Sequence, residues 1–180
     1  MKIEVLNAKR ALTKEEQKIV RKHPKLGYEF LKRNFDFDPS VCEGVLEHHE
    51  WNNGEGYPLH KSGEDISIYA RIIKIADVYD AMTSKRPYHK ELCPADAVEY
   101  IMSMNETEFD PETVKIFVKW IAVYPVGCEV KLSDGRRAIV EKNTPDFVLR
   151  PVIRVLDSGE VIDLKTDVDA RHLTIVGMQN

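Results

Sequence analysis

The sequence predicts a mainly α-helical fold followed by a small β-strand appendage, and three observations support this. Apolar residues recur at helical spacing in several segments before residue 122. After Tyr124-Pro125 the pattern changes to the alternation typical of strands. The 180 residues are 43% hydrophobic and 31% charged, which is the composition of a folded protein. We therefore predict a helical domain over residues 1–122 and a β appendage over residues 123–180.

The first predicted helices have clear start and stop signals. Thr13 and Glu16 match a capping box ahead of a short helix. Pro24 interrupts or restarts that helix, because proline cannot continue the hydrogen-bond pattern of a helix interior. The next helical stretch, KLGYEFLKRN, has its apolar residues at helical spacing and ends at Asn34.

Two helices in the middle of the chain carry residues of chemical interest. Residues 39–49 have helical periodicity, so the adjacent histidines His48 and His49 are predicted to end a helix. Residues 66–82, ISIYARIIKIADVYDAM, form a long and mostly apolar segment. Because its apolar residues cover more than one stripe, we expect this helix to be the most buried in the chain.

The remaining helices begin at prolines. Pro94 fits the first turn of a helix through about Met104. Asp110 and Pro111 are predicted to be the N-cap and the first residue of a helix to about Ala122.

Several short strands follow. CEVKLSDGRRAIV alternates around Asp134-Gly135, which is a strong signal for a hairpin. The segments LRPVIRVL, EVIDL and RHLTIV, separated by turn residues, predict further strands.

Charge and cysteine content exclude some classes of function. A formal net charge of -4 argues against long-range attraction to a nucleic-acid polymer or an anionic membrane, so phosphate binding has to be local. Cys42, Cys93 and Cys128 are odd in number and form no Cys-x-x-Cys pair, which favours reduced thiols and a cytoplasmic protein. The sequence contains no signal peptide or apolar run of membrane-spanning length.

His23, His48, His49 and Asp77 are the candidate metal ligands. His23, which precedes a proline, could equally be a surface residue at a helix junction. Adjacent histidines on a helix point about 100 degrees apart, which suits two metals, or one metal and a phosphate, better than a simple chelate. A polar helix end is the alternative for this pair.

Asp77 and Asp80 lie on one face of the apolar segment. A carboxylate within an apolar helix needs a partner, which could be a metal or a cation. Arg71, Lys74 and Arg86 are the candidate cations for a salt bridge.

The GEGYP loop could bind a phosphate. Gly54 and Gly56 leave backbone amides accessible, although the same glycines could simply permit a tight turn. Arg86 could donate to a phosphate or could stabilise the helix dipole.

Together, the segments KHPKLG, HHEWNNGEGYP, ARIIKIADVYDAMTSKRPYHK and EFDPETVKIF resemble the HD-GYP family, a branch of the HD metal-dependent phosphohydrolases. Their order and spacing match over about the first two thirds of the chain. The resemblance implies an all-helical domain that holds iron, manganese or similar ions and hydrolyses cyclic di-GMP. Metal-assisted hydrolysis of this kind uses the ions to acidify a bound water and to hold the phosphodiester.

The resemblance also implies roles for individual residues. It makes His23, His48, His49 and Asp77 metal ligands. It places Gly54, Gly56, Tyr57, Pro58 and Arg86 against the substrate. Asp80 would lie near the site, in catalysis or in support of a ligand. Imidazole and carboxylate ligands suit iron, manganese or zinc better than calcium or magnesium.

One part of the family pattern is missing. A His-Asp pair followed by glycine and lysine should precede the segment VLNAKRALTKEE, but the chain begins there and contains no His-Asp dipeptide. We therefore expect a bundle truncated at its N-terminus, with an incomplete metal site. Apolar helix faces left uncovered would favour a homo-oligomer or helix exchange. The two hypotheses are a cyclic di-GMP phosphodiesterase and a non-catalytic nucleotide-binding or scaffolding module derived from one.

Overall fold

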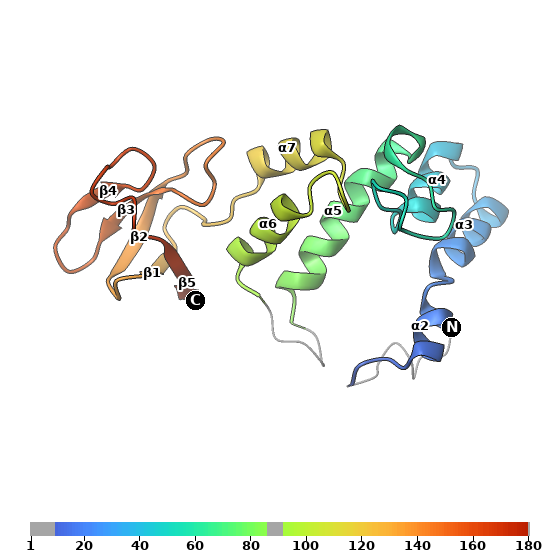
Figure 1. Cartoon of the computed structure of the whole chain (residues 1–180), viewed down its shortest axis with the longest axis horizontal. Coiled ribbons are helices and arrows are strands. Elements are labelled where there is room, and N and C mark those ends of the chain that lie inside the picture. Colours follow the sequence, from blue (N-terminus) through green and yellow to red (C-terminus); the bar gives the residue numbers. More distant parts are fainter. Residues whose placement is uncertain (1–9, 86–91, 180) are drawn as a thin grey trace. The chain divides into compact units, whose positions relative to one another are not determined.

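The computed structural model describes residues 10–85 and 92–179, and the chain divides into two compact units (Figure 1). The first unit comprises residues 1–92 and 99–114, and the second comprises residues 93–98 and 115–180. Helices followed by a small antiparallel sheet are the observed elements, so the predicted mainly α class is confirmed. The predicted boundary at residue 122 stays a prediction.

The helices begin close to where the sequence predicts them. Their bounds are α2 Lys14–Val20, α3 His23–Asn34, α4 Pro39–Glu47, α5 Ile68–Thr83, α6 Pro94–Ser103 and α7 Pro111–Trp120, with a short 3-10 helix, η1, at Gly63–Asp65. The predicted capping box is confirmed: the Thr13 hydroxyl accepts from the Glu16 amide, and the Glu16 carboxylate accepts from the Thr13 amide. The Asp110 carboxylate likewise accepts from the Thr113 amide at 2.9 Å and caps α7.

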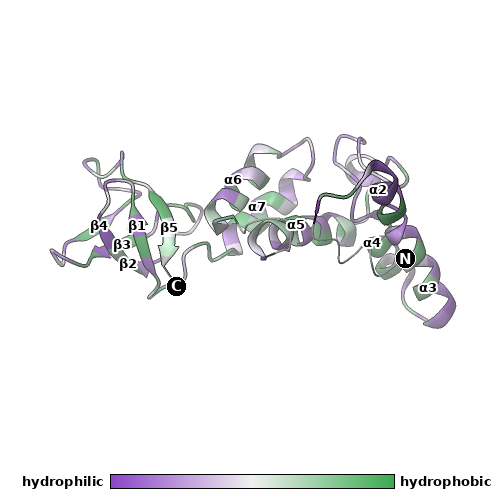
Figure 2. Ribbon diagram, turned by 90° about the horizontal axis from the view of Figure 1, so that it is seen from below, coloured by the Kyte–Doolittle hydropathy of each residue, from purple (hydrophilic) through white to green (hydrophobic). Residues whose placement is uncertain are grey.

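The burial predicted for the segment 66–82 is wrong. Within α5 only Ala70, Lys74 and Ile75 are buried, whereas Ile68 and Ile72 are 47% and 54% exposed. Hydrophobic and hydrophilic residues are intermixed along the helices in Figure 2, and the exposed Ile68 and Ile72 belong to an apolar stripe of α5 that no described element covers. A broad apolar surface predicts burial only if a partner element is present to cover it.

The salt bridges of the first unit also differ from the predicted set. Arg71 pairs with Asp110 at 3.1 Å, and Lys74 pairs with Glu108 at 2.9 Å. These two cations therefore connect α5 to the segment before α7. They are not paired with Asp77, for which the sequence offered them as candidate partners.

The second unit contains a five-stranded antiparallel sheet with the order β4-β3-β2-β1-β5. The strands are β1 Glu129–Leu132, β2 Arg137–Lys142, β3 Val152–Val155, β4 Val161–Asp163 and β5 Ile175–Gln179. The predicted hairpin is confirmed: β1 pairs with β2, and Gly135 has a φ of +92 in the turn. Val130, Leu132, Ala138 and Val140 are fully buried, so the alternation predicted from the sequence defines the core face.

Among the described residues, the helices are too short or too polar to cross a membrane.

The three cysteines are unpaired, and Cys42 is buried.

Candidate metal centre

Three histidines from separate positions in the sequence converge in the first unit. His23 begins α3, His48 caps the C-terminus of α4, and His49 follows it. One ring nitrogen from each of the three lies within 4.8 Å of the others. The His48 and His49 ring centroids are 4.2 Å apart, because both residues lie beyond the last turn of α4. The divergence of about 100 degrees expected for neighbours on a helix therefore does not hold here.

Backbone carbonyls fix the orientation of two of these rings. The Nδ1 atom of His23 lies 2.9 Å from the carbonyl oxygen of Val20, and the Nδ1 atom of His48 lies 2.7 Å from that of Val45. Because a carbonyl oxygen only accepts, each Nδ1 carries the hydrogen. Each neutral ring then presents an unprotonated Nε2 atom. In histidines that bind metals, the ring nitrogen that does not contact the metal commonly donates a hydrogen bond of this kind.

The two Nε2 atoms face each other at 3.1 Å. With both Nδ1 atoms protonated, this contact joins two acceptors and is repulsive unless a cation lies between or beside them. A proton or a metal ion could fill that role. His23 and His48 are therefore arranged to bind a cation.

The electrostatics disfavour a proton on His48 and on His49. Burial lowers the pKa of His48 below its usual value. Burial, followed by the neighbouring histidines and the positive charges of Lys74 and Arg21, lowers the pKa of His49 to about 3. Both rings are neutral near pH 7, and the neutral imidazole is the form that binds metals. Three imidazole nitrogens fit a transition metal such as iron, manganese or zinc.

The two aspartates lie outside this group of three. Asp77 is exposed, so the desolvation argument for a buried carboxylate does not apply to it. Its negative charge nevertheless raises the pKa of His48 and of Tyr57, which places it near the cluster. Asp80 is also exposed and accepts a hydrogen bond of 2.8 Å from the Ser84 hydroxyl. Arg86 lies outside the described residues.

The GYP loop packs directly on the histidines. The Tyr57 ring stacks on His49, with 4.8 Å between centroids and 21° between planes. The Tyr57 amide donates to the His49 carbonyl at 3.1 Å. A Cβ atom on Gly56 would overlap the backbone nitrogen of Trp51, so only glycine fits there. Gly54 has a φ of +85, and Pro58 is half-buried.

Buried carboxylates support the loop, and sequence reasoning did not select them. Glu50, 1% exposed, accepts from the Leu59 amide at 2.5 Å. Glu47, 2% exposed, pairs with Lys61 at 2.6 Å and accepts from the Ser67 amide at 2.8 Å. The position of Glu50 directly after the histidine pair was the available signal.

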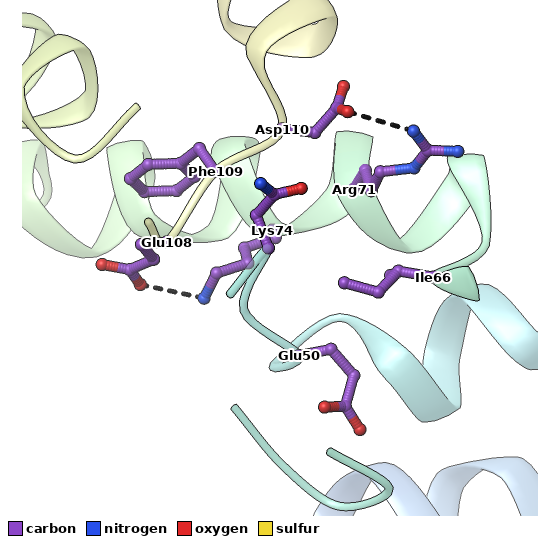
Figure 3. Close-up of a pocket in the computed structure, with 8 residues that line it drawn as sticks. Glu50, Ile66, Arg71, Lys74, Glu108, Phe109 and Asp110 are labelled. Carbon is purple, nitrogen blue, oxygen red and sulfur yellow. Dashed lines mark hydrogen bonds and ion pairs between the residues drawn. The ribbon is translucent and has the colours of Figure 1, made fainter. Parts of the chain in front are cut away.

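A small cavity lies next to the buried Glu50 (Figure 3). Glu50, Lys74 and Glu108 line it. In Figure 3 one dashed line marks the ion pair between Lys74 and Glu108, and the other marks that between Arg71 and Asp110. The Tyr100 hydroxyl donates to the other Glu108 oxygen at 2.8 Å. Burial and this carboxylate raise the pKa of Tyr100 to about 12. The network fixes α5 to the segment that precedes α7.

Comparison with protein families shows which family the sequence of this chain matches. A family model described as the HD domain matches residues 2–113. The chain belongs to the HD domain family. The resemblance to the HD-GYP branch that the sequence indicates is thus confirmed at the level of the HD domain.

Relatives of this HD domain protein carry related names. It is 38% identical to a cyclic di-GMP phosphodiesterase of Pseudomonas aeruginosa, over 86% of this chain and 37% of that protein. A cyclic di-GMP phosphodiesterase of Borreliella burgdorferi is 30% identical over 86% of this chain and 41% of its own length. A 3'3'-cGAMP-specific phosphodiesterase of Vibrio cholerae is 33% identical over 64% of this chain and 22% of its own length. The chain therefore spans well under half the length of these relatives.

Proposed function

We propose that this HD domain chain is part of a metal-dependent phosphodiesterase of the HD-GYP type that hydrolyses cyclic di-GMP. The observation that carries the proposal is the convergence of His23, His48 and His49, in which the Nε2 atoms of His23 and His48 lie 3.1 Å apart while their Nδ1 atoms face backbone carbonyls. The names of the relatives support a cyclic dinucleotide as the substrate.

The residues have distinct roles in this proposal. His23, His48 and His49 would hold the metal, and Asp77 would be a further ligand. Iron or manganese is the proposed metal, and when bound it supplies Lewis acidity toward a phosphodiester and its attacking water. Asp80 supports the site from the next turn of α5.

The loop and Arg86, which lies outside the described residues, complete the proposed site. Tyr57 and Pro58 contact the nucleotide, with Tyr57 held against His49 by stacking. The backbone at Gly54 and Gly56 approaches the phosphates, and Arg86 donates to a phosphate oxygen.

Replacing His48 by alanine should remove both metal and turnover. The purified chain is loaded with manganese or iron, its metal content is measured by elemental analysis, and cyclic di-GMP hydrolysis is followed by chromatography. We expect the variant to lose ten-fold or more in metal affinity, since one of three nitrogen ligands is gone. His172→Ala, an exposed histidine in the second unit, is the matched control and should behave as the wild type.

The same experiment separates the two hypotheses. Metal-dependent turnover that is lost with His48 supports the enzyme. Cyclic di-GMP binding without turnover, even with manganese or iron added, would instead support a non-catalytic nucleotide-binding or scaffolding module. The position of Asp77 outside the histidine group is the observation that favours this alternative.

We also propose that the first unit self-associates through its exposed apolar side chains. Leu26 and Phe30 of α3 are 50% and 59% exposed, and Ile72 of α5 is 54% exposed. Such surfaces are unusual on a stable monomer. Sedimentation equilibrium should give a mass that rises with concentration, and Ile72→Glu should shift it toward the monomer. Val168→Glu, at an exposed valine of the second unit, is the control, and a concentration-independent monomer mass would refute the proposal.

A further inference from the structure

The side chain of Arg21 lies over the ring of Tyr57, which in turn stacks on His49 of the three-histidine group. It follows the last turn of α2, and its guanidinium carbon lies 4.9 Å from the centroid of the Tyr57 ring. Tyr57 in turn stacks on His49 at 4.8 Å. A guanidinium over an aromatic ring is attracted by the negative face of the ring, so Tyr57 holds this cation beside the candidate metal centre.

The charge of Arg21 is not neutralised by a described carboxylate. Within residues 10–85 and 92–179, no ion pair is formed by this exposed side chain. Arg10, by contrast, is engaged by Glu16 at 2.7 Å.

This geometry leaves hydrogen-bond donors available. Cation-π stacking uses the face of a guanidinium, whereas its N–H donors lie in the plane and point outward from the edges. A planar fork of such donors matches two oxygens of a phosphate group. Arg21 therefore combines a position over Tyr57, next to the histidines, with a charge and donors that no acceptor in the described part of the chain engages.

We propose that Arg21, held on Tyr57, binds a phosphate oxygen of the phosphodiester substrate beside His23, His48 and His49. The role rests on the proposed function, because it places the substrate at the same site. Arg21 is a binding residue in this arrangement, and Tyr57 positions it. The ligands expected for Arg21 in this position are phosphodiester anions.

The test compares the binding of two phosphodiesters to the full chain. Isothermal titration calorimetry with cyclic di-GMP and with bis(4-nitrophenyl) phosphate is carried out in the presence of a chelator, so that no turnover interferes. The variants are Arg21→Ala, Arg21→Lys and Arg33→Ala. Arg33 is an exposed arginine in the last turn of α3, about 15 Å along the helix from His23, and it provides the matched loss of charge.

We expect Arg21→Ala to raise the Kd for both anions roughly ten-fold to a hundred-fold at low salt, as the loss of a charge-assisted hydrogen bond would. The difference should shrink as salt is raised, because screening weakens the contact in the wild type. Arg21→Lys should recover part of the affinity, and Arg33→Ala should change it less than two-fold. A purely structural role for Arg21 would lower the melting temperature without a salt-dependent change in Kd.

Each result decides the proposal. Equal affinity of the wild type and Arg21→Ala for cyclic di-GMP overturns the role of Arg21 and leaves the proposed function intact. Arg21-dependent binding of bis(4-nitrophenyl) phosphate without binding of cyclic di-GMP supports the phosphate contact and contradicts the proposed substrate. No binding of either anion by the wild type in the chelator overturns the role of Arg21, and the proposed function is then decided by the metal-dependent turnover measured with His48→Ala.

Discussion

Replacing Gly56 by alanine is expected to disrupt the GYP loop and to abolish the proposed phosphodiesterase activity. The added Cβ atom would overlap the Trp51 nitrogen and lie 2.5 Å from the backbone of Glu50. Backbone atoms cannot move aside as a flexible side chain can, so the loop has to shift away from the histidines. We expect a loss of about 3 kcal/mol in the free energy of unfolding, at the upper end of the range for overpacking. Denaturant titration of the purified variant measures this loss.

A second glycine serves as the control for Gly56. Gly177 in β5 has open space where a Cβ atom would lie and no positive φ, so Gly177→Ala should be close to neutral. If Gly56→Ala retained the stability of the wild type in the denaturant titration, the tight approach of the loop to Trp51 would be contradicted.

Replacing Lys74 by methionine is expected to destabilise the first unit by about 3–5 kcal/mol, the usual cost of removing one partner of a buried ion pair. The side chains of Lys74 and Glu108 are 6% and 7% exposed, and their charged atoms are 2.9 Å apart. Methionine fills a similar volume but leaves the Glu108 charge buried with only the Tyr100 hydroxyl as a partner. Urea unfolding followed by circular dichroism measures the loss.

Two further variants test the cause of that loss. The double variant Lys74→Met with Glu108→Gln should recover part of the stability, because no uncompensated charge is then buried. Arg154→Met removes an exposed pair with Glu141, whose side chains are 48% and 33% exposed, and should cost less than about 1 kcal/mol. Equal effects of Lys74→Met and Arg154→Met would show that the buried pair has no special weight.

The positions of the helices and strands were largely predictable from local signals. The capping box at Thr13, the proline at the start of α7 and the Asp134-Gly135 turn each act over a few residues, so their structural effect can be deduced without knowledge of the fold. The last strand was less predictable. RHLTIV suggested pairing from residue 171, but β5 begins at Ile175, since its start is set by pairing with β1.

The candidate site was predictable in its residue types but not in its geometry. The sequence identified the histidines, the GYP loop and Asp77 as a set. It did not indicate that Glu47 and Glu50 are buried supports, that Lys74 and Glu108 pair across 34 positions, or that Arg21 lies on Tyr57. These contacts join residues distant in sequence, and neither periodicity nor residue type specifies such distances.

The sequence by itself determined the helical and β segments, the residues capable of binding a metal, and the membership of the HD domain family. Only the tertiary structure decided that the Nε2 atoms of His23 and His48 face each other, because that depends on where α3 begins relative to the end of α4. It also decided that α5 exposes one apolar stripe, since burial depends on the elements that pack around a helix and not on its own composition.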